Sequence, residues 1–302
     1  MTAEQRAAVN DMLRDGPLDL AMPVDAQRSV FEELFGSAEL PSDVTATDDV
    51  VGGVPVVRFD FSAPSTTGVL LYMHGGAFAV GNARGSLPLA TDLARRAQLR
   101  GFSVDYRLAP EHPFPAASQD VVAAYHGLIE TVDSTSVVVV GESAGGNLVL
   151  ALLLALRDAA APLPAAAAVF SPVGDLTLSG ATMTSKADVD PVITAAGLRL
   201  RVIDYLAGAD PRDPRVSPVF ADLSGLPPLL IQSGSHEVLL DDAVRLAGAA
   251  ARADVEVRLD VVPGVPHVFQ GFAETLDEGA AALDRAGVFL TEHLHHAAGS
   301  DR

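Results

Sequence analysis

Residues 137–145 read Val-Val-Val-Val-Gly-Glu-Ser-Ala-Gly, and this stretch decides the fold class. A run of β-branched residues is typical of a buried strand, and the apolar stretch at 147–156 that follows has helical character. Glycines at 141 and 145 flank the serine, so the backbone can turn sharply and pass close to its surroundings. The stretch therefore predicts a strand–turn–helix unit with Ser143 at the turn, as found in α/β folds.

The turn places Ser143 as a candidate nucleophile. A G-x-S-x-G sequence between a strand and a helix lifts the serine oxygen clear of its neighbours. The N–H groups at the start of the following helix point towards the serine and favour negative charge there. A serine alone is a poor nucleophile, so the chain must also supply a base, an orienting acid and an oxyanion hole.

Backbone donors for an oxyanion are predicted in a glycine-rich loop earlier in the chain. Residues 69–73 read as a buried strand, and residues 74–78 follow it as His-Gly-Gly-Ala-Phe. Consecutive glycines after a strand free the backbone to aim its N–H groups inward, with Gly75 shaping the loop. The expected donors are the N–H groups of Gly76, Ala77 and Ala144.

The candidate base and acid lie in the C-terminal third. His267 follows the strand-like run 255–262 and is the histidine with the right order and flanks to act as the base. Glu237 is the first carboxylate beyond the strand-like run 228–233, so we interpret it as the acid that accepts the histidine N–H. Asp241 and Asp242 are the rivals, although they fall in the first turn of the next predicted helix, where acids favour the dipole.

Serine, acid and histidine occur in the chain order of α/β-hydrolases. Residues 74–77, His-Gly-Gly-Ala, stand where one family has His-Gly-Gly-Gly, and residues 141–146 stand where it usually has Gly-Asp-Ser-Ala-Gly-Gly. Residues 105–116, Asp-Tyr-Arg-Leu-Ala-Pro-Glu-His-Pro-Phe-Pro-Ala, are a near-complete version of a long family signature. Over about residues 65–295 the chain thus resembles the bacterial hormone-sensitive-lipase-like (family IV) carboxylesterases.

Two positions depart from the family pattern. Ala77 replaces the third glycine of the oxyanion loop, so its N–H remains available if the backbone there tolerates a Cβ, and its methyl group is expected to narrow the acyl pocket. Around the acid, the family's usual Asp-Pro-Leu reads Glu-Val-Leu at 237–239, which supports Glu237 by position.

Composition agrees with one large globular core. The chain has 302 residues, of which 49% are hydrophobic and 20% charged, and strand-like runs alternate with helical stretches. This alternation predicts an α/β-hydrolase fold with a mostly parallel central sheet flanked by helices. The site is then expected at the carboxyl ends of the strands, where all the candidate residues fall.

Charge and residue usage exclude several partners. The net charge of −19 disfavours nucleic acid and anionic membranes. The chain has no cysteine, and its start lacks a basic region and an apolar signal core, so we expect a soluble cytoplasmic protein. Asp188 and Asp190 are interpreted as turn and cap residues rather than metal ligands, and we expect no metal and no cofactor.

The chain is expected to divide into an N-terminal helical segment at 1–45 and a catalytic domain at 46–302. The first segment holds a predicted helix at about 26–35, and an alternating run at 54–61 predicts an antiparallel or edge strand. The resemblance implies that the N-terminal segment forms part of a cap over the site. The alternative is a packing arm that does not touch the substrate.

A second cap piece is predicted as an insertion at about 174–224. Prolines break this region around a helical stretch at 195–206, and insertions on the active-site side usually shape the substrate pocket. The pocket walls are expected to come from the N-terminal helices and from three further residues: Phe78, Tyr205 and Leu206.

These expectations combine into a serine carboxylic-ester hydrolase. The resemblance implies short- to medium-chain esters as substrates, because a cap limits the pocket, and it allows a homodimer. Three alternatives stay open: a lactone hydrolase on the same residues, an amidase or peptidase, and a non-catalytic ligand-binding member of the fold.

Overall fold

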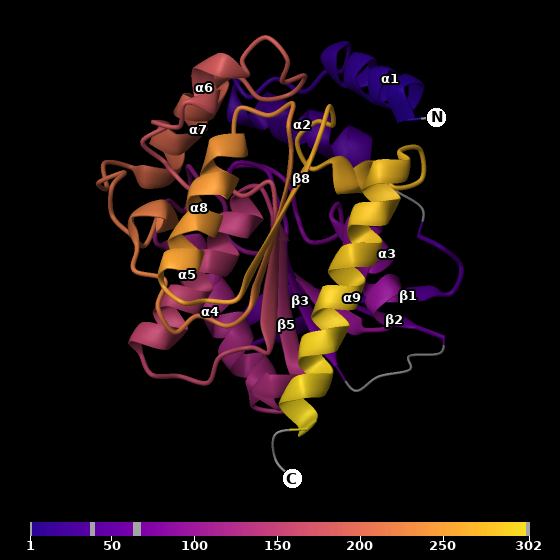
Figure 1. Cartoon of the computed structure of the whole chain (residues 1–302), viewed down its shortest axis with the longest axis vertical. Helices are drawn as coiled ribbons and strands as arrows, with labels where there is room; N and C mark the ends of the chain where they lie inside the picture. Colours follow the sequence, from indigo (N-terminus) through magenta and orange to yellow (C-terminus); the bar gives the residue numbers. More distant parts are fainter. Residues whose placement is uncertain (1, 37–39, 63–67, 300–302) are drawn as a thin grey trace.

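The computed structural model describes residues 2–36, 40–62 and 68–299, which form one sheet with helices on both faces (Figure 1). The described residues build an eight-stranded sheet in the order β1-β2-β4-β3-β5-β6-β7-β8. The strands are β1 (Val44–Val51), β2 (Val54–Phe61), β3 (Val69–Met73), β4 (Arg100–Val104), β5 (Val137–Glu142), β6 (Ala166–Phe170), β7 (Leu229–Gly234) and β8 (Val257–Val262).

Strand direction confirms the predicted fold class. The strands from β4 and β3 through β8 pair in parallel, whereas β2 is antiparallel to both β1 and β4. The strand predicted at 54–61 is therefore antiparallel, as expected. The central strands β3 and β6 are buried along their whole length, because helices cover both of their faces. This mixed but mostly parallel sheet is that of an α/β-hydrolase.

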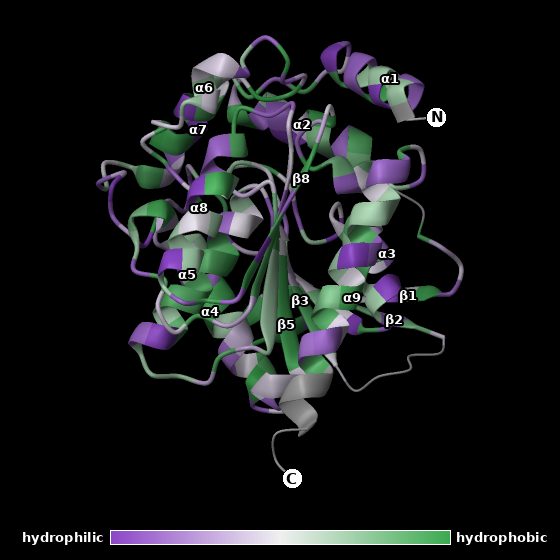
Figure 2. Ribbon diagram, in the orientation of Figure 1, coloured by the Kyte–Doolittle hydropathy of each residue, from purple (hydrophilic) through white to green (hydrophobic). Residues whose placement is uncertain are grey.

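Helices cover the two faces of the sheet in separate layers. One apolar cluster packs α4, α5 and α8 against one face, and a second packs α3 and α9 against the other. Figure 2 shows the hydrophobic residues gathered along the sheet and on the inner sides of these helices. Their bounds are α3 (Leu87–Ala97), α4 (Ala116–Ile129), α5 (Ala144–Asp158), α8 (Leu240–Arg252) and α9 (Asp277–Gly299).

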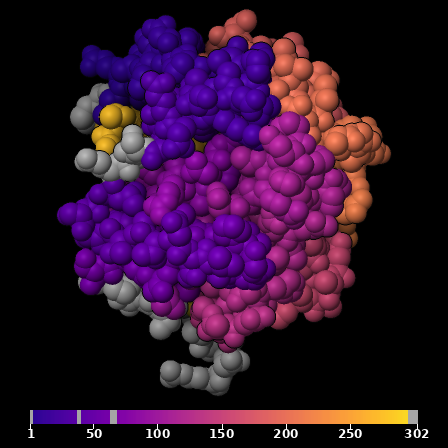
Figure 3. All heavy atoms as spheres, turned by 180° about the vertical axis from the view of Figure 1, so that it is seen from behind, coloured from indigo at the N-terminus to yellow at the C-terminus, as the bar shows by residue number. Residues whose placement is uncertain are grey.

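Two segments far apart in sequence form a cap above the sheet. The N-terminal piece contains α1 (Thr2–Arg14) and α2 (Val24–Phe35), and the insertion contains α6 (Thr182–Ser185) and α7 (Ala195–Leu206). Arg201 of α7 donates to the Met22 carbonyl at 3.1 Å, and Arg14 donates to the Val189 carbonyl at 3.3 Å. In Figure 3 the indigo N-terminal segment lies beside the orange insertion. The two pieces thus pack as one layer.

The first helix also contacts the C-terminal part of the chain. Gln5 donates to the Asp277 carboxylate at 3.2 Å, and Arg6 lies 3.4 Å from the Glu278 carboxylate. Arg6 also donates to the carbonyl of Pro263 at 2.9 Å, in the loop after β8. These contacts join α1 to the start of α9 and, through Pro263, to the loop that carries His267.

The structure differs from the sequence prediction at β1. This strand begins at Val44, inside the segment predicted as helical, so the sheet starts before the expected boundary at 45. It lies at the edge of the sheet and its side chains are mostly exposed, which leaves little apolar pattern to predict it. Residues 1, 37–39, 63–67 and 300–302 of the predicted units lie outside the described chain. Among the described helices, none is long and apolar enough to cross a bilayer.

Candidate active site

Ser143 lies at the sharp turn between β5 and α5, as its sequence predicts. Its backbone adopts φ 53° and ψ −118°, a sparsely populated region that costs roughly 1–3 kcal/mol. A Cβ at Gly141 would lie 2.5 Å from the Gly145 backbone, and one at Gly145 would lie 2.0 Å from the Met73 carbonyl oxygen. Glycine is therefore required on both sides of the serine, because the turn packs directly against β3.

The loop after β3 presents backbone N–H groups near this turn. Gly76 has φ 113°, and a Cβ there would lie 2.1 Å from the Val80 carbonyl oxygen. Ala77 has φ 50°, a left-handed conformation that an L-residue adopts at a moderate cost, so the Cβ is tolerated. In the described chain the N–H groups of Gly76, Ala77 and Ala144 donate to no protein acceptor. They remain available to a ligand.

Gly75 takes a different part in the loop. Its N–H donates to the Glu142 carboxylate at 2.8 Å, so this N–H is already used within the protein. A Cβ at Gly75 would lie 3.3 Å from the Cβ of Ser143, a contact tighter than most. Gly75 therefore shapes the loop and allows it to approach the serine, as expected from the sequence.

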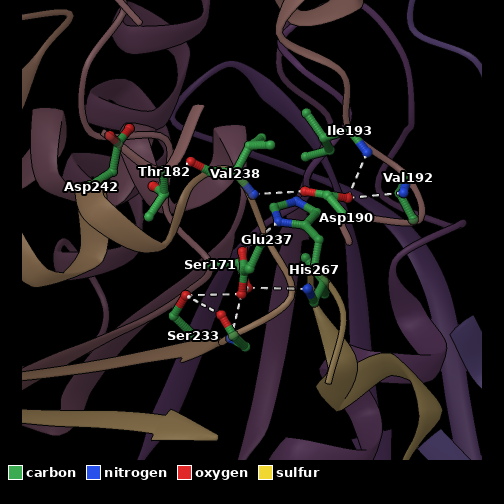
Figure 4. A network of polar contacts seen from close by, with 12 residues as sticks. Ser171, Thr182, Asp190, Val192, Ile193, Ser233, Glu237, Val238, Asp242 and His267 are labelled. Carbon is green, nitrogen blue, oxygen red and sulfur yellow. Dashed lines mark hydrogen bonds and ion pairs between the residues drawn. The ribbon is translucent and has the colours of Figure 1, made fainter. Parts of the chain in front are cut away.

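His267 and Glu237 are in direct contact. The imidazole Nδ1 of His267 lies 2.9 Å from Oε2 of Glu237, whose side chain is fully buried (Figure 4). The other oxygen of Glu237 accepts hydrogen bonds from the Ser171 hydroxyl at 2.8 Å, the Ser233 hydroxyl at 2.9 Å and the Gly234 N–H. These three donors hold the carboxylate and offset part of the cost of burying its charge.

The two rival carboxylates are used elsewhere. Asp241 accepts the N–H of Ala181 at 2.9 Å, and Asp242 accepts the N–H of Gly174 at 2.9 Å. Both lie in the first turn of α8, as the sequence predicts. Of the three candidate acids, Glu237 is the one that the structure brings to His267.

Ser143 and His267 line a common cavity of about 280 Å³ beneath the cap. The loop after β3 and Glu142 also line it. The remaining walls are mainly apolar and come from both cap pieces, so the N-terminal segment does touch the cavity. These cap residues include Pro17, Leu18, Leu20, Met22, Val30, Phe31, Phe35, Val192, Ile193 and Leu198.

Three residues expected in the pocket walls lie elsewhere. Phe78 and Tyr205 stack with ring centroids 3.8 Å apart, both buried in the core, and Leu206 is buried beside them. None of the three lines the cavity. The left-handed backbone at Phe78, φ 64°, follows that of Ala77, so the loop turns the phenyl ring into the core while Ala77 stays at the cavity. The order of residues in the sequence does not show which of these side chains points into the core and which faces the cavity.

Two titratable residues at the cavity were not predicted as site residues. Burial raises the pKa of Glu142 to about 7, and it lowers the pKa of His74 to about 4. The His74 ring stacks on the Tyr106 ring, with the centroids 4.1 Å apart. The stacking holds the neutral imidazole in place at the start of the loop. The position of Glu142 next to the nucleophile was the available signal, since the family usually has aspartate there.

Comparison with known proteins agrees with this fold. The family model described as alpha/beta hydrolase fold matches residues 70–271. An acetyl-hydrolase of Streptomyces hygroscopicus is 42% identical over 260 residues, covering 86% of each chain. An esterase of Acinetobacter venetianus is 38% identical over 229 residues, covering 75% of this chain and 76% of the other.

Solved structures place the chain more narrowly. A crystal structure of an esterase from the bacterial hormone-sensitive lipase family matches with a TM-score of 0.93 and 38% identity, over 97% of this chain and 99% of the other. The fold and the match to the family model define an α/β-hydrolase. Within that class, the chain belongs to the hormone-sensitive-lipase family of esterases.

Proposed function

We propose that this esterase hydrolyses short- to medium-chain carboxylic esters through an acyl-enzyme formed on Ser143. The observation that supports it is the 2.9 Å contact between His267 and the buried Glu237, at the same cavity as the strained Ser143. A serine, a base and an orienting acid in this order are the parts that acyl transfer requires.

The proposed reaction has two halves. The Ser143 oxygen attacks the ester carbonyl carbon while His267 takes the hydroxyl proton, and Glu237 stabilises the imidazolium. The carbonyl oxygen becomes an oxyanion and accepts hydrogen bonds from the N–H groups of Gly76, Ala77 and Ala144. The alcohol leaves with the proton from His267. Water then attacks the acyl-enzyme, with His267 as base, and releases the acid.

Cavity size and lining support the proposed range of substrates. Ligand pockets for small molecules commonly measure roughly 300–1,000 Å³, and the cavity of about 280 Å³ lies at the lower end. Its apolar cap residues favour an uncharged acyl chain. No group of three or more His, Asp or Glu side chains among the described residues is arranged to hold a metal ion.

The first experiment is the hydrolysis of p-nitrophenyl esters from acetate to decanoate, with Ser143→Ala beside the natural protein. We expect turnover to be highest for short to medium chains, and to be lost in the variant because the nucleophile is gone. Turnover that Ser143→Ala leaves unchanged would contradict the mechanism. If no ester is hydrolysed, lactones would be tested next. If lactones are not hydrolysed either, the non-catalytic ligand-binding role would be considered.

We also propose a homodimer that pairs through β8. Within the described residues, β8 is an edge strand, and an edge with exposed apolar side chains is a template for pairing with another chain. Leu259 and Val261 on β8 are 40% and 39% exposed, and Val288 on the neighbouring α9 is 57% exposed. A second copy related by a two-fold axis would cover this surface.

A further inference from the structure

The loop that carries Glu237 is held from the cap insertion. Glu237, Val238 and Leu239 are fully buried, so the polar groups of their backbone need partners inside the protein. Both backbone groups of Val238 find them in cap side chains (Figure 4). The N–H donates to Asp190 at 2.8 Å, and the carbonyl accepts from the Thr182 hydroxyl at 2.7 Å.

Thr182 makes a second contact with the same loop. Its hydroxyl oxygen accepts the N–H of Asp241 at 2.9 Å while it donates to the Val238 carbonyl. The Asp241 carboxylate in turn accepts the N–H of Ala181. The start of α6 and the start of α8 are thus joined by reciprocal hydrogen bonds. One hydroxyl thus joins Val238, the residue directly after the acid, to Asp241, three positions further along the chain.

Asp190 connects the same loop to the cavity wall. Its second oxygen accepts the N–H groups of Val192 at 2.9 Å and Ile193 at 2.8 Å, and both residues line the cavity. Burial raises the pKa of Asp190 because it disfavours the charged carboxylate, and the three N–H donors partly oppose this rise. A half-buried carboxylate therefore joins the cavity wall to the residue next to Glu237.

We propose that Thr182 and Asp190 of the cap insertion are positioning residues for the acid of the reaction. They fix the backbone of Val238, so that the preceding Glu237 points its carboxylate at His267. The cap then has two roles: it walls the cavity, and it holds part of the reacting geometry. This inference rests on the proposed function, because it acts through Glu237.

The contacts on Glu237 itself show why such support is needed. Ser171, Ser233 and Gly234 hold one oxygen of the carboxylate from the sheet side, and His267 contacts the other. None of these bonds fixes the loop beyond Glu237. Because a displacement of about 1 Å at a reacting group can cost on the order of 100-fold in rate, support of the following backbone affects catalysis.

The test starts from two near-isosteric changes. Thr182→Val removes the hydroxyl that contacts Val238 and Asp241, and Asp190→Asn removes one of the two carboxylate oxygens as an acceptor. We expect each to lower kcat for p-nitrophenyl butyrate by roughly tenfold. Thr182→Ser should restore most of the rate because it keeps the hydroxyl. Matched controls are Thr184→Val and Asp188→Asn, exposed neighbours in the same insertion, with kcat unchanged.

A double-mutant cycle with Glu237→Gln separates positioning from a general structural role. If Thr182 and Asp190 act through the acid, their substitution should change kcat by less than about threefold once Glu237 is replaced. A loss that stays tenfold in the Glu237→Gln background would overturn the inference, as would an unchanged kcat in both single variants. If Thr182→Val does not fold, Asp190→Asn carries the same cycle by itself.

The two proposals fail in different ways. If Glu237→Gln by itself leaves kcat unchanged, the acid assignment in the proposed function is at fault and positioning through it is excluded as well. If Glu237→Gln lowers kcat strongly while Thr182→Val and Asp190→Asn do not, the proposed function stands and the inference about the cap is refuted.

Discussion

Glu142 shows how one residue can connect two parts of the site. It follows β5 directly before Ser143, and its carboxylate reaches the Gly75 N–H at the start of the oxyanion loop. Aspartate, usual in the family at this position, is one methylene shorter. Burial raises the pKa of Glu142 to about 7, and the hydrogen bond from the Gly75 N–H partly opposes this by favouring the charged carboxylate.

The choice of acid can be tested by comparing two substitutions. Glu237→Gln should lower kcat by on the order of 100-fold or more, since an amide cannot stabilise the imidazolium as a carboxylate does. Asp241→Asn should change kcat by less than about threefold, because Asp241 bonds Ala181 in the cap rather than His267. Steady-state kinetics on one p-nitrophenyl ester measures both.

Circular dichroism of the two variants serves as the control for folding. The acid assignment fails if the ranking is reversed, with Asp241→Asn the more damaging change.

The residues that could be predicted from sequence are those set by local structure. Ser143 follows from the glycines that flank it, and His267 and Glu237 from their places after strands. Phe78 and Tyr205 were misplaced because the direction of a side chain depends on φ and on tertiary packing, which motif order does not contain. Asp190 was interpreted as a turn residue, and its contact with the N–H of Val192 agrees with that. Its contact with Val238, 48 positions away, forms only in the folded chain and could not be predicted.

At the scale of elements, the strands of the sheet could be predicted better than the packing of the two cap pieces. The buried strands β3, β5, β6 and β7 each begin with an apolar run, and α7 begins and ends where its sequence predicts. The exposed edge strand β1 has no such pattern. How the two cap pieces pack on each other depends on contacts such as Arg201 to Met22, between segments nearly two hundred positions apart.

The junction of α8 with the cap insertion predicts a pH dependence of stability. Burial raises the pKa of Asp242 to about 7 from an ordinary value of 3.8. As pH rises from about 4 to 7, the unfolded chain loses this proton before the folded chain does, so the free energy of unfolding falls. Asp242→Asn removes this loss and keeps an oxygen for the N–H groups of Gly174 and Asp175.

We therefore expect Asp242→Asn to raise Tm, relative to the natural protein, by more at pH 8 than at pH 5. One pKa unit corresponds to about 1.4 kcal/mol. The gain in the free energy of unfolding should therefore be larger at pH 8 than at pH 5 by at least that order. Thermal unfolding at the two pH values measures it, with Asp241→Asn in the same helical turn as control. Equal changes in Tm at both pH values would contradict the raised pKa of Asp242 in the folded chain.

At the scale of the whole molecule, the sheet leaves β8 as an edge. If two copies pair there, light scattering after size-exclusion chromatography should give twice the chain mass of 31.2 kDa. Val261→Lys places a charge on the exposed face of this strand, and we expect it to shift the protein to the monomer. The matched control is Val50→Lys on β1, which is 64% exposed and lies on the strand at the opposite edge of the sheet. A dimer that survives Val261→Lys would place the interface elsewhere.

The contacts of α1 with Asp277 and Glu278 have a consequence for biosynthesis. A ribosome releases α1 and α2 first, yet their partners in the loop after β8 and in α9 are made last. At about 5–20 residues per second, the N-terminal helices wait on the order of ten seconds or longer with apolar side chains uncovered. During translation this segment is a natural client for chaperones. His267, the proposed base, is also made late, so the nascent chain carries Ser143 long before the two residues can meet.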